Sequence, residues 1–333
     1  MDLMMKTIFK CLFPALFLTV TAPAFAQSVC VFDPSGANGD AYFFMKDYAV
    51  NSRQFGADIT LKPYTDEQKA TSAFKSGKCD GLFATGIRIR QFNNFTGSID
   101  NVGQIPTTDV AKTILYLVAN PKLAPEMING DTEIAGVSPL GAAYPIATDR
   151  TMNTMAKIFG KRFAVLDYDP AQNEIVQKIG AVPVTVSLST IAEKFNSGQV
   201  DMVDLPIYAY KALDLSKGMA KGGIGRYTIA FLTTQLIIHP GKFPADYGQK
   251  SRNWFANQLN RQFQSIKRLE DSVAPNDWVE LRDADKLGYD KLLREARLSL
   301  IHQGVYNKRM ANITKKARCQ KYPSGFDCGM GEE

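Results

Sequence analysis

Residues 195–204 read FNSGQVDMVD, and residues 74–83 read FKSGKCDGLF, 121 positions earlier in a chain of 333 residues. The two decamers share four residues in one register, namely the pairs Phe74 and Phe195, Ser76 and Ser197, Gly77 and Gly198, and Asp80 and Asp201. Each decamer is typical of a helix end, a glycine that closes the helix, and the strand that follows. The repeat therefore predicts two copies of one structural unit.

The surroundings of both decamers have the same order of elements: strand, loop, helix, strand, helix, strand. In the first copy the strands are 29–32, 57–64 and 79–85, with helices over 41–55 and from Thr65 to Gly77; in the second the strands are 163–168, 181–187 and 200–205, with helices over 170–178 and from Thr190 to Gly198. Such alternation predicts an α/β fold with mostly parallel sheets flanked by helices. We expect two lobes, each with a sheet of its own, and ligand in a cleft lined by the loops after the strands.

Two long apolar segments, 113–121 and 226–240, are predicted to be extended and to form a strand hinge between the lobes. Residues 250–273 and 286–317 have a helical pattern and predict long C-terminal helices. The domain organisation that follows is a first lobe over 27–115, a second lobe over 116–228, and a return to the first lobe over 229–333.

The N-terminal 26 residues have the order of a secretory signal peptide: basic residues, an apolar core at 13–20, and a small-residue site ending at Ala26. Their removal takes away two lysines and one aspartate, so the formal net charge falls from +6 to +5. This charge is scattered, whereas a nucleic-acid binder needs a clustered basic face. We expect a periplasmic monomer that binds no nucleic acid.

Four cysteines remain after the signal peptide: Cys30, Cys79, Cys319 and Cys328. An even count in an oxidising compartment favours disulfides, and four cysteines allow three pairings. We favour Cys30 with Cys79, which open two predicted strands of one unit, and Cys319 with Cys328, which enclose a short tail. A metal site is disfavoured because no CxxC occurs and the two histidines, His239 and His302, lie far from the cysteines in the sequence.

Residues 160–206 resemble the substrate-binding proteins of TRAP transporters, the DctP type, through GAVPV at 180–184 and VDMVDLP at 200–206. The likeness is greatest to the AdeT group of solute-binding proteins, some of which have been described as efflux components. The resemblance implies a type II periplasmic binding protein with separate membrane transporter subunits as partners. The sequence departs from the family in two ways. Ala164 stands where the family carries an arginine that grips a substrate carboxylate, and a methyl group cannot replace a guanidinium fork. Met202 and Asp204 stand where the family has glycine and glutamate.

The loops after the predicted strands and the hinge supply the candidate ligand-binding residues: Asp33, Ser35, Thr85, Arg88, Arg90, Asp167, Tyr168, Asp204, Tyr208, Thr233 and Gln235. Asp204 is the most promising, because it ends a buried strand where an ionised carboxylate is costly without a partner. Arg88 and Arg90 could supply positive charge or lie on the surface, Asp33 could belong to a turn, and the two tyrosines could be packing residues. This set would suit an amine or a polyol as readily as a carboxylate.

An enzymatic reading has less support. Ser72 and Lys75 match the S-x-x-K pattern of acyl-serine enzymes, but its S-D-N and K-T-G companions are missing, and no G-x-S-x-G, P-loop or H-E-x-x-H occurs. The sequence therefore predicts no enzyme and no cofactor. It predicts a receptor that captures a small-molecule solute between its lobes and delivers it to a TRAP-type transporter. The alternative is an envelope interaction protein that kept the fold and associates with an efflux assembly.

Overall fold

The computed structural model describes residues 26–331 and 333, so the predicted signal peptide lies outside the described residues apart from Ala26. The strands are β1 (Gln27–Phe32), β2 (Ile59–Tyr64), β3 (Gly81–Thr85), β4 (Ile128–Asn129), β5 (Thr132–Ala147), β6 (Arg162–Leu166), β7 (Val182–Val186), β8 (Met202–Pro206), β9 (Gly223–Gly225), β10 (Ala230–Ile238) and β11 (Trp278–Val279). The α-helices are α1 (Asp40–Ser52), α2 (Glu67–Lys75), α3 (Gly86–Ile89), α4 (Asn94–Gly97), α5 (Thr108–Val118), α6 (Met155–Ile158), α7 (Pro170–Lys178), α8 (Ile191–Asn196), α9 (Ile207–Ala212), α10 (Tyr247–Asp271), α11 (Asp283–His302) and α12 (Lys308–Lys321).

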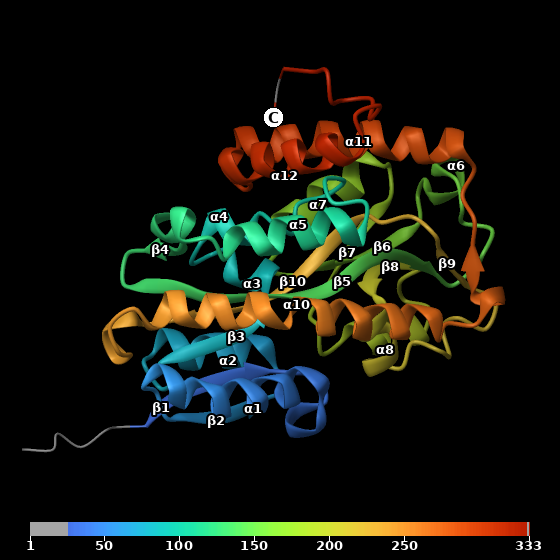
Figure 1. Ribbon diagram of the computed structural model, residues 1–333. Helices are drawn as coiled ribbons and strands as arrows, with labels where there is room; N and C mark the ends of the chain where they lie inside the picture. Colours follow the sequence, from blue (N-terminus) through green and yellow to red (C-terminus); the bar gives the residue numbers. More distant parts are fainter. Residues whose placement is uncertain (1–25, 332) are drawn as a thin grey trace, which may run out of the picture.

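The strands are arranged in the order β2-β1-β3-β10-β5-β8-β6-β7. The first lobe holds the parallel set β2-β1-β3, and the second lobe holds the parallel set β8-β6-β7. Between these sets, β5 and β10 form an antiparallel pair. In Figure 1 the N-terminal elements β1, α1 and β2 lie at one end of the molecule and α11 and α12 at the other, with α10 packed along β5 between them. The predicted two-lobed α/β architecture is confirmed.

Our expectation of a separate sheet in each lobe was wrong. β10 pairs with β3 of the first lobe, β5 pairs with β8 of the second, and both pair with one another, so the hydrogen bonding is continuous across the molecule. The two lobes nevertheless have separate cores, because Phe74 and Phe195 belong to different hydrophobic clusters. The continuity therefore comes from two shared crossing strands.

The repeated decamers have the same structure, and their shared residues explain why. Gly77 and Gly198 end α2 and α8 in the left-handed region, each with φ of +71°, which favours glycine. Asp80 accepts a hydrogen bond of 2.8 Å from the backbone N–H of Ser28 at the start of β1, and Asp201 accepts one of 2.8 Å from the N–H of Arg162 at the start of β6. In each lobe the aspartate thus fixes the first strand beside the third.

One of the two predicted hinge segments was wrong. Residues 226–240 contain β10, as predicted, but 113–121 contain the end of helix α5. The second crossing strand is β5, which the sequence reading missed because it contains Gly136, Gly141 and two prolines, residues that normally interrupt strands. A side chain at Gly136 would collide with the ring of Phe255, so this glycine allows α10 to approach the sheet.

Smaller differences concern helix ends. Asp66, rather than Thr65, caps α2 by accepting from the backbone N–H of Lys69, whereas Asp169 caps α7 as predicted. The predicted helix over 286–317 is two helices, α11 and α12, separated at Gly304 with φ of +75°.

Both predicted disulfides are present. Cys30–Cys79 ties β1 to the loop before β3, with 5.8 Å between Cα atoms, and Cys319–Cys328 closes the tail after α12.

Candidate ligand-binding site

A small, partly open cavity lies where the second-lobe sheet, helix α7 and β10 meet. Its volume is about 50 Å³, and a water molecule needs roughly 10–15 Å³ on the same scale. Its lining comes from both lobes and the crossing strands: Ile87, Asp100, Val102, Ala143, Phe163, Ala164, Asp169, Gln172, Ile175, Val176, Asp204, Ile229, Ala230, Leu232 and Tyr306. Two positions that the sequence singled out are therefore brought together in this cavity. They are Asp204 and Ala164, the position at which DctP-type proteins carry an arginine.

Asp100 lies in the wall of this cavity and is held by the hinge strand. Its carboxylate accepts hydrogen bonds from the hydroxyl and the backbone N–H of Thr233, at 2.6 and 3.1 Å. Gly86 makes room for this pair, because a Cβ there would lie 2.3 Å from the Thr233 hydroxyl. Burial raises the pKa of Asp100 to about 7, although the hydrogen bonds from Thr233 oppose the shift.

Asp204 lines the cavity from β8. Its Oδ1 is buried and has no hydrogen-bond partner among the described residues. Burial alone raises the pKa of Asp204 to about 7. A carboxylate in this position is costly to ionise because no hydrogen bond from residues 26–331 or 333 reaches its Oδ1.

Asp169 joins the lobes at the edge of the cavity. Its Oδ1 accepts from the backbone N–H of Ala171 at the start of α7 and from the guanidinium of Arg90 in the first lobe, at 3.1 and 3.0 Å. Arg90 also donates to the carbonyl of Gly97 and lies 4.9 Å from the ring centre of Tyr306. Burial by itself would lower the pKa of Arg90, but the charge of Asp169 raises it on balance. Arg90 is therefore committed to a buried ion pair.

A reciprocal contact links the lobes elsewhere. Asp33 follows β1 and accepts from the N–H groups of Ser35, Ala41 and Tyr42, so it caps the N-terminus of α1. It also accepts, at 3.1 Å, from the hydroxyl of Tyr208, which follows β8 in the second lobe. The two lobes therefore have equivalent contacts. Asp33 after β1 and Asp169 after β6 each cap a helix. Asp33 also accepts a hydrogen bond from Tyr208, which follows β8, and Asp169 accepts one from Arg90, which follows β3.

A third cross-lobe contact involves Tyr168, which follows β6. Its hydroxyl donates to Glu67 at 2.9 Å, and the guanidinium carbon of Arg88 lies 3.3 Å from its ring centre. Arg88 pairs with Glu67 at 3.4 Å and donates to Gln68 at 2.8 Å. The sequence left open whether Arg88 and Arg90 supply positive charge to the site or lie on the surface. Helix α3 turns them toward different partners, and their side chains are only 8% and 9% exposed, so neither is a surface residue.

The other sequence-predicted residues lie at varied places. Thr85 caps α3 and donates its N–H to Glu67, while Thr233 and Gln235 are buried on β10. Gln235 donates to the carbonyl of Thr96 and to Thr233. Ser35 and Asp167 are exposed and do not line the cavity.

Sequence reasoning missed Glu67, Asp100, Asp169 and Tyr306 as site residues. Asp169 had a signal, since the Asp-Pro step after β6 echoes Asp33-Pro34 after β1. Asp100 and Tyr306 had none, because they come from a loop and from the C-terminal region, and only the tertiary structure brings them to β8 and α7.

A larger, open groove of about 800 Å³ lies between α1 and α10. Phe43, Phe44 and Trp254 contribute aromatic surface to it, and Tyr208 is the one sequence-predicted site residue that the described part of the chain places there. Arg261 at its rim pairs with Asp47.

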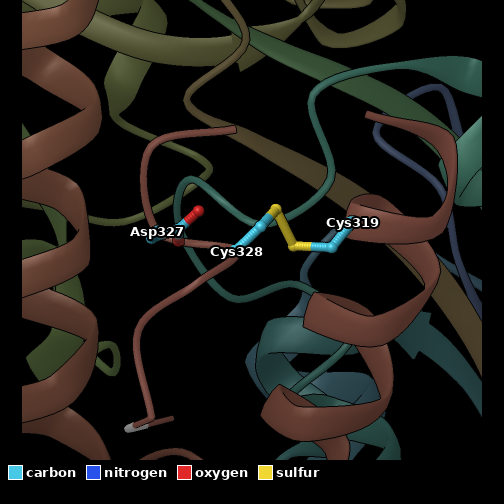
Figure 2. Close-up of side chains that lie close together, drawn as sticks. All are labelled: Cys319, Asp327 and Cys328. Carbon is cyan, nitrogen blue, oxygen red and sulfur yellow. A yellow bond between two sulfur atoms is a disulfide. The ribbon is translucent and has the colours of Figure 1, made fainter. Parts of the chain in front are cut away.

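Two other groups of residues resemble chemical sites: the cysteines near the C-terminus and the S-x-x-K match on α2. Figure 2 shows Cys319 and Cys328 bonded to each other beside Asp327. The disulfide removes both thiolates as ligands, and Asp327 pairs with Arg318 at 2.6 Å, so we assign no metal centre to this group. Ser72 and Lys75 of the S-x-x-K match are exposed on α2.

Within residues 26–331 and 333, no helix combines the length and apolar character needed to cross a bilayer.

Comparisons with solved structures show the fold. The chain resembles a TRAP periplasmic solute-binding protein from Desulfovibrio salexigens with bound orotic acid, with a TM-score of 0.73, 13% identity, and coverage of 89% of this chain and 99% of that one. It also resembles such a protein from Rhodoferax ferrireducens with bound malonate, with a TM-score of 0.71, 11% identity, and coverage of 90% and 100%.

Sequence comparisons show the family. The model of the solute-binding protein AdeT 1/2 family matches residues 49–333. The chain is 41% identical over 304 residues to the protein named probable solute-binding protein AdeT1 of Acinetobacter baumannii, covering 91% of this chain and all of that relative. It is 28% identical over 235 residues to AdeT2 of the same organism, covering 70% of this chain and 99% of that relative. The chain belongs to the AdeT1/AdeT2 family of solute-binding proteins, a family of binding proteins rather than an enzyme class.

Proposed function

We propose that this protein is a periplasmic receptor that captures a small polar solute between its two lobes and delivers it to the membrane subunits of a TRAP-type transporter. The observation that carries the proposal is the small cavity beside Ala164, with walls from both lobes and from the crossing strand β10. A ligand in this place contacts both lobes at once, so it favours the closed arrangement over an open one by differential contacts.

The cross-lobe contacts support this role. Asp33 with Tyr208, Asp169 with Arg90, and Tyr168 with Glu67 all come from loops that follow strands. These contacts form only when the lobes are together, so they give a closed surface that a transporter can distinguish from the open one. The membership of the AdeT family and the TRAP-type fold agree with delivery to separate membrane subunits.

Native mass spectrometry of protein purified without denaturation tests the proposal. A receptor is expected to carry a co-purified small molecule, or to gain thermal stability with a member of a broad metabolite screen. Asp204→Ala is expected to lose that response, and Asp167→Ala is the matched control because Asp167 is exposed outside the cavity.

The alternative is an envelope interaction protein that retained the fold. Ala164 favours it, because the family's carboxylate clamp is missing. Two results together would favour this alternative over the receptor. The purified protein would carry no small molecule and respond to no metabolite, and it would bind an envelope protein through the same lobes.

A further inference from the structure

Within the receptor function proposed above, we propose that the cavity beside Ala164 takes a small cation, namely an ammonium head group with a short apolar part, and discriminates against carboxylates. The proposal names the class of solute. It rests on the charge of the cavity wall, on an unpartnered carboxylate, and on the difference between the two repeated units.

The wall of the cavity is acidic. Asp100, Asp169 and Asp204 line the cavity, and no described lining residue is a lysine or an arginine. The guanidinium of Arg90 acts on Asp100, but it is already bonded to Asp169 and to the carbonyl of Gly97. Three carboxylates against one guanidinium leave two negative charges when all are ionised. A carboxylate ligand would add a like charge in a site of low polarity, where such repulsion is weakly screened.

Asp204 is the residue that a cation would complete. Its Oδ1 is buried without any hydrogen-bond partner, whereas Asp100 receives two bonds from Thr233 and Asp169 receives bonds from Arg90 and Ala171. A buried polar atom of this kind needs an explanation, since such atoms are almost always satisfied in folded proteins. The N–H donors of an ammonium group would supply the missing partner.

The repeat gives an independent argument. The last residue of the first decamer is Phe83, which is 1% exposed in the core of the first lobe, and the corresponding residue of the second decamer is Asp204. In the first lobe this fold position is therefore filled by a buried aromatic side chain. A carboxylate at this position of the second lobe loses that packing, and binding a cation accounts for the exchange.

The size and remaining lining fit a small amine. About 50 Å³ admits a few heavy atoms, and Phe163, Ile175 and Leu232 provide apolar wall beside the carboxylates. Two tyrosines lie near these carboxyl groups: Tyr289, whose pKa the charges of Asp285 and Asp204 help to raise, and Tyr306, which lies against Arg90. Burial raises the pKa of both tyrosines, so neither places a negative charge in the cavity at neutral pH.

Isothermal titration and thermal shift with methylammonium chloride at pH 8 test the inference. Sodium chloride controls for ionic strength, and sodium acetate is the anionic probe of matched size. We expect methylammonium to bind and to raise the melting temperature, and acetate to do neither. Asp204→Asn keeps the shape but removes the charge, and should raise the Kd for methylammonium at least tenfold. Asp167→Asn should change it less than twofold.

Each contrary outcome overturns the inference. The first is binding of acetate in place of methylammonium. The second is a wild-type protein that shows no response to methylammonium at concentrations up to the millimolar range. The third is a Kd for methylammonium that is unchanged in Asp204→Asn. If Asp204→Asn does not fold by circular dichroism, the wild-type contrast between methylammonium and acetate decides alone. An anionic molecule co-purified in native mass spectrometry would overturn the cation class while the receptor function stands.

Discussion

At equivalent positions the first lobe carries a disulfide and the second lobe carries Ala164 and Val200. Cys30 lies two residues after the amide that Asp80 fixes, and Ala164 lies two residues after the amide that Asp201 fixes. Cys79 and Val200 each immediately precede these aspartates. The first lobe is therefore cross-linked where the second has only small apolar side chains, and the cavity lies beside the second. In the first lobe this part of the repeated unit is cross-linked by a disulfide, whereas in the second lobe it borders a cavity.

The reciprocal cross-lobe contacts differ in the same way. Asp33 accepts from the neutral hydroxyl of Tyr208, whereas Asp169 accepts from the charged Arg90. The neutral contact costs little to open, because a hydroxyl and a helix-capping carboxylate can both be hydrated. The charged contact is buried, and separating its partners inside the protein would be far more costly.

The largest expected effect comes from Arg90→Met. It leaves Asp169 buried without its guanidinium, and we expect the free energy of unfolding, measured in urea, to fall by about 3–5 kcal/mol. Arg53→Met is the matched control, since Arg53 pairs with Asp58 on the surface, and its loss should be below about 1 kcal/mol. If Arg90→Met and Arg53→Met lose the same free energy of unfolding, the buried pair of Arg90 and Asp169 does not hold the lobes together.

Cys30→Ala with Cys79→Val gives the first lobe the residues of the second. We expect a loss of about 2–4 kcal/mol, because the disulfide closes a loop with a sequence separation of 49. The control is Cys319→Ala with Cys328→Ala, which opens a loop with a separation of only 9 and should cost less. A larger loss in the tail variant than in the lobe variant would contradict the chain-entropy argument.

Asp204 should make stability depend on pH. Its pKa in the folded protein is raised to about 7 by burial, above the value near 4 of an unfolded aspartate. The carboxyl group is therefore protonated in the folded state at low pH, and its contribution to stability is lost as the pH rises toward and through 7. Between pH 5 and 8 we expect the wild type to lose about 2 kcal/mol relative to Asp204→Asn, from urea unfolding at each pH. The difference between the wild type and Asp167→Asn should stay nearly constant, and an equal slope in both variants would count against burial of the Asp204 carboxyl group.

Tyr208→Phe should have the smallest effect. Asp33 keeps its three backbone donors, so the loss is one hydrogen bond and about 1 kcal/mol. Tyr168→Phe, which removes the bond to Glu67, provides the comparison between the two tyrosine contacts. A Tyr208→Phe loss as large as that of Arg90→Met would show that the two reciprocal contacts are equivalent after all.

Much of the fold followed from local pattern. The strands around both decamers, the capping role of Asp169 and the glycine helix ends depend on neighbours within a few residues, so sequence reading found them. β5 was missed because its glycines have tertiary causes, such as the close approach of Phe255 to Gly136. The site was found only in part. Asp204 was recognisable as a polar residue on a buried strand, but Asp100 comes from a loop that the pattern did not assign.

By itself, the sequence determined the duplicated α/β units and the family, because each rests on the order and spacing of nearby residues, and it favoured the two disulfides among three possible pairings. The tertiary structure decided which side chains meet: it turned Arg88 and Arg90 to different partners, joined the lobes through shared strands, and enclosed three carboxylates beside Ala164. The physical reason is that backbone geometry repeats locally, whereas the charge of a cavity is the sum over residues distant in the chain.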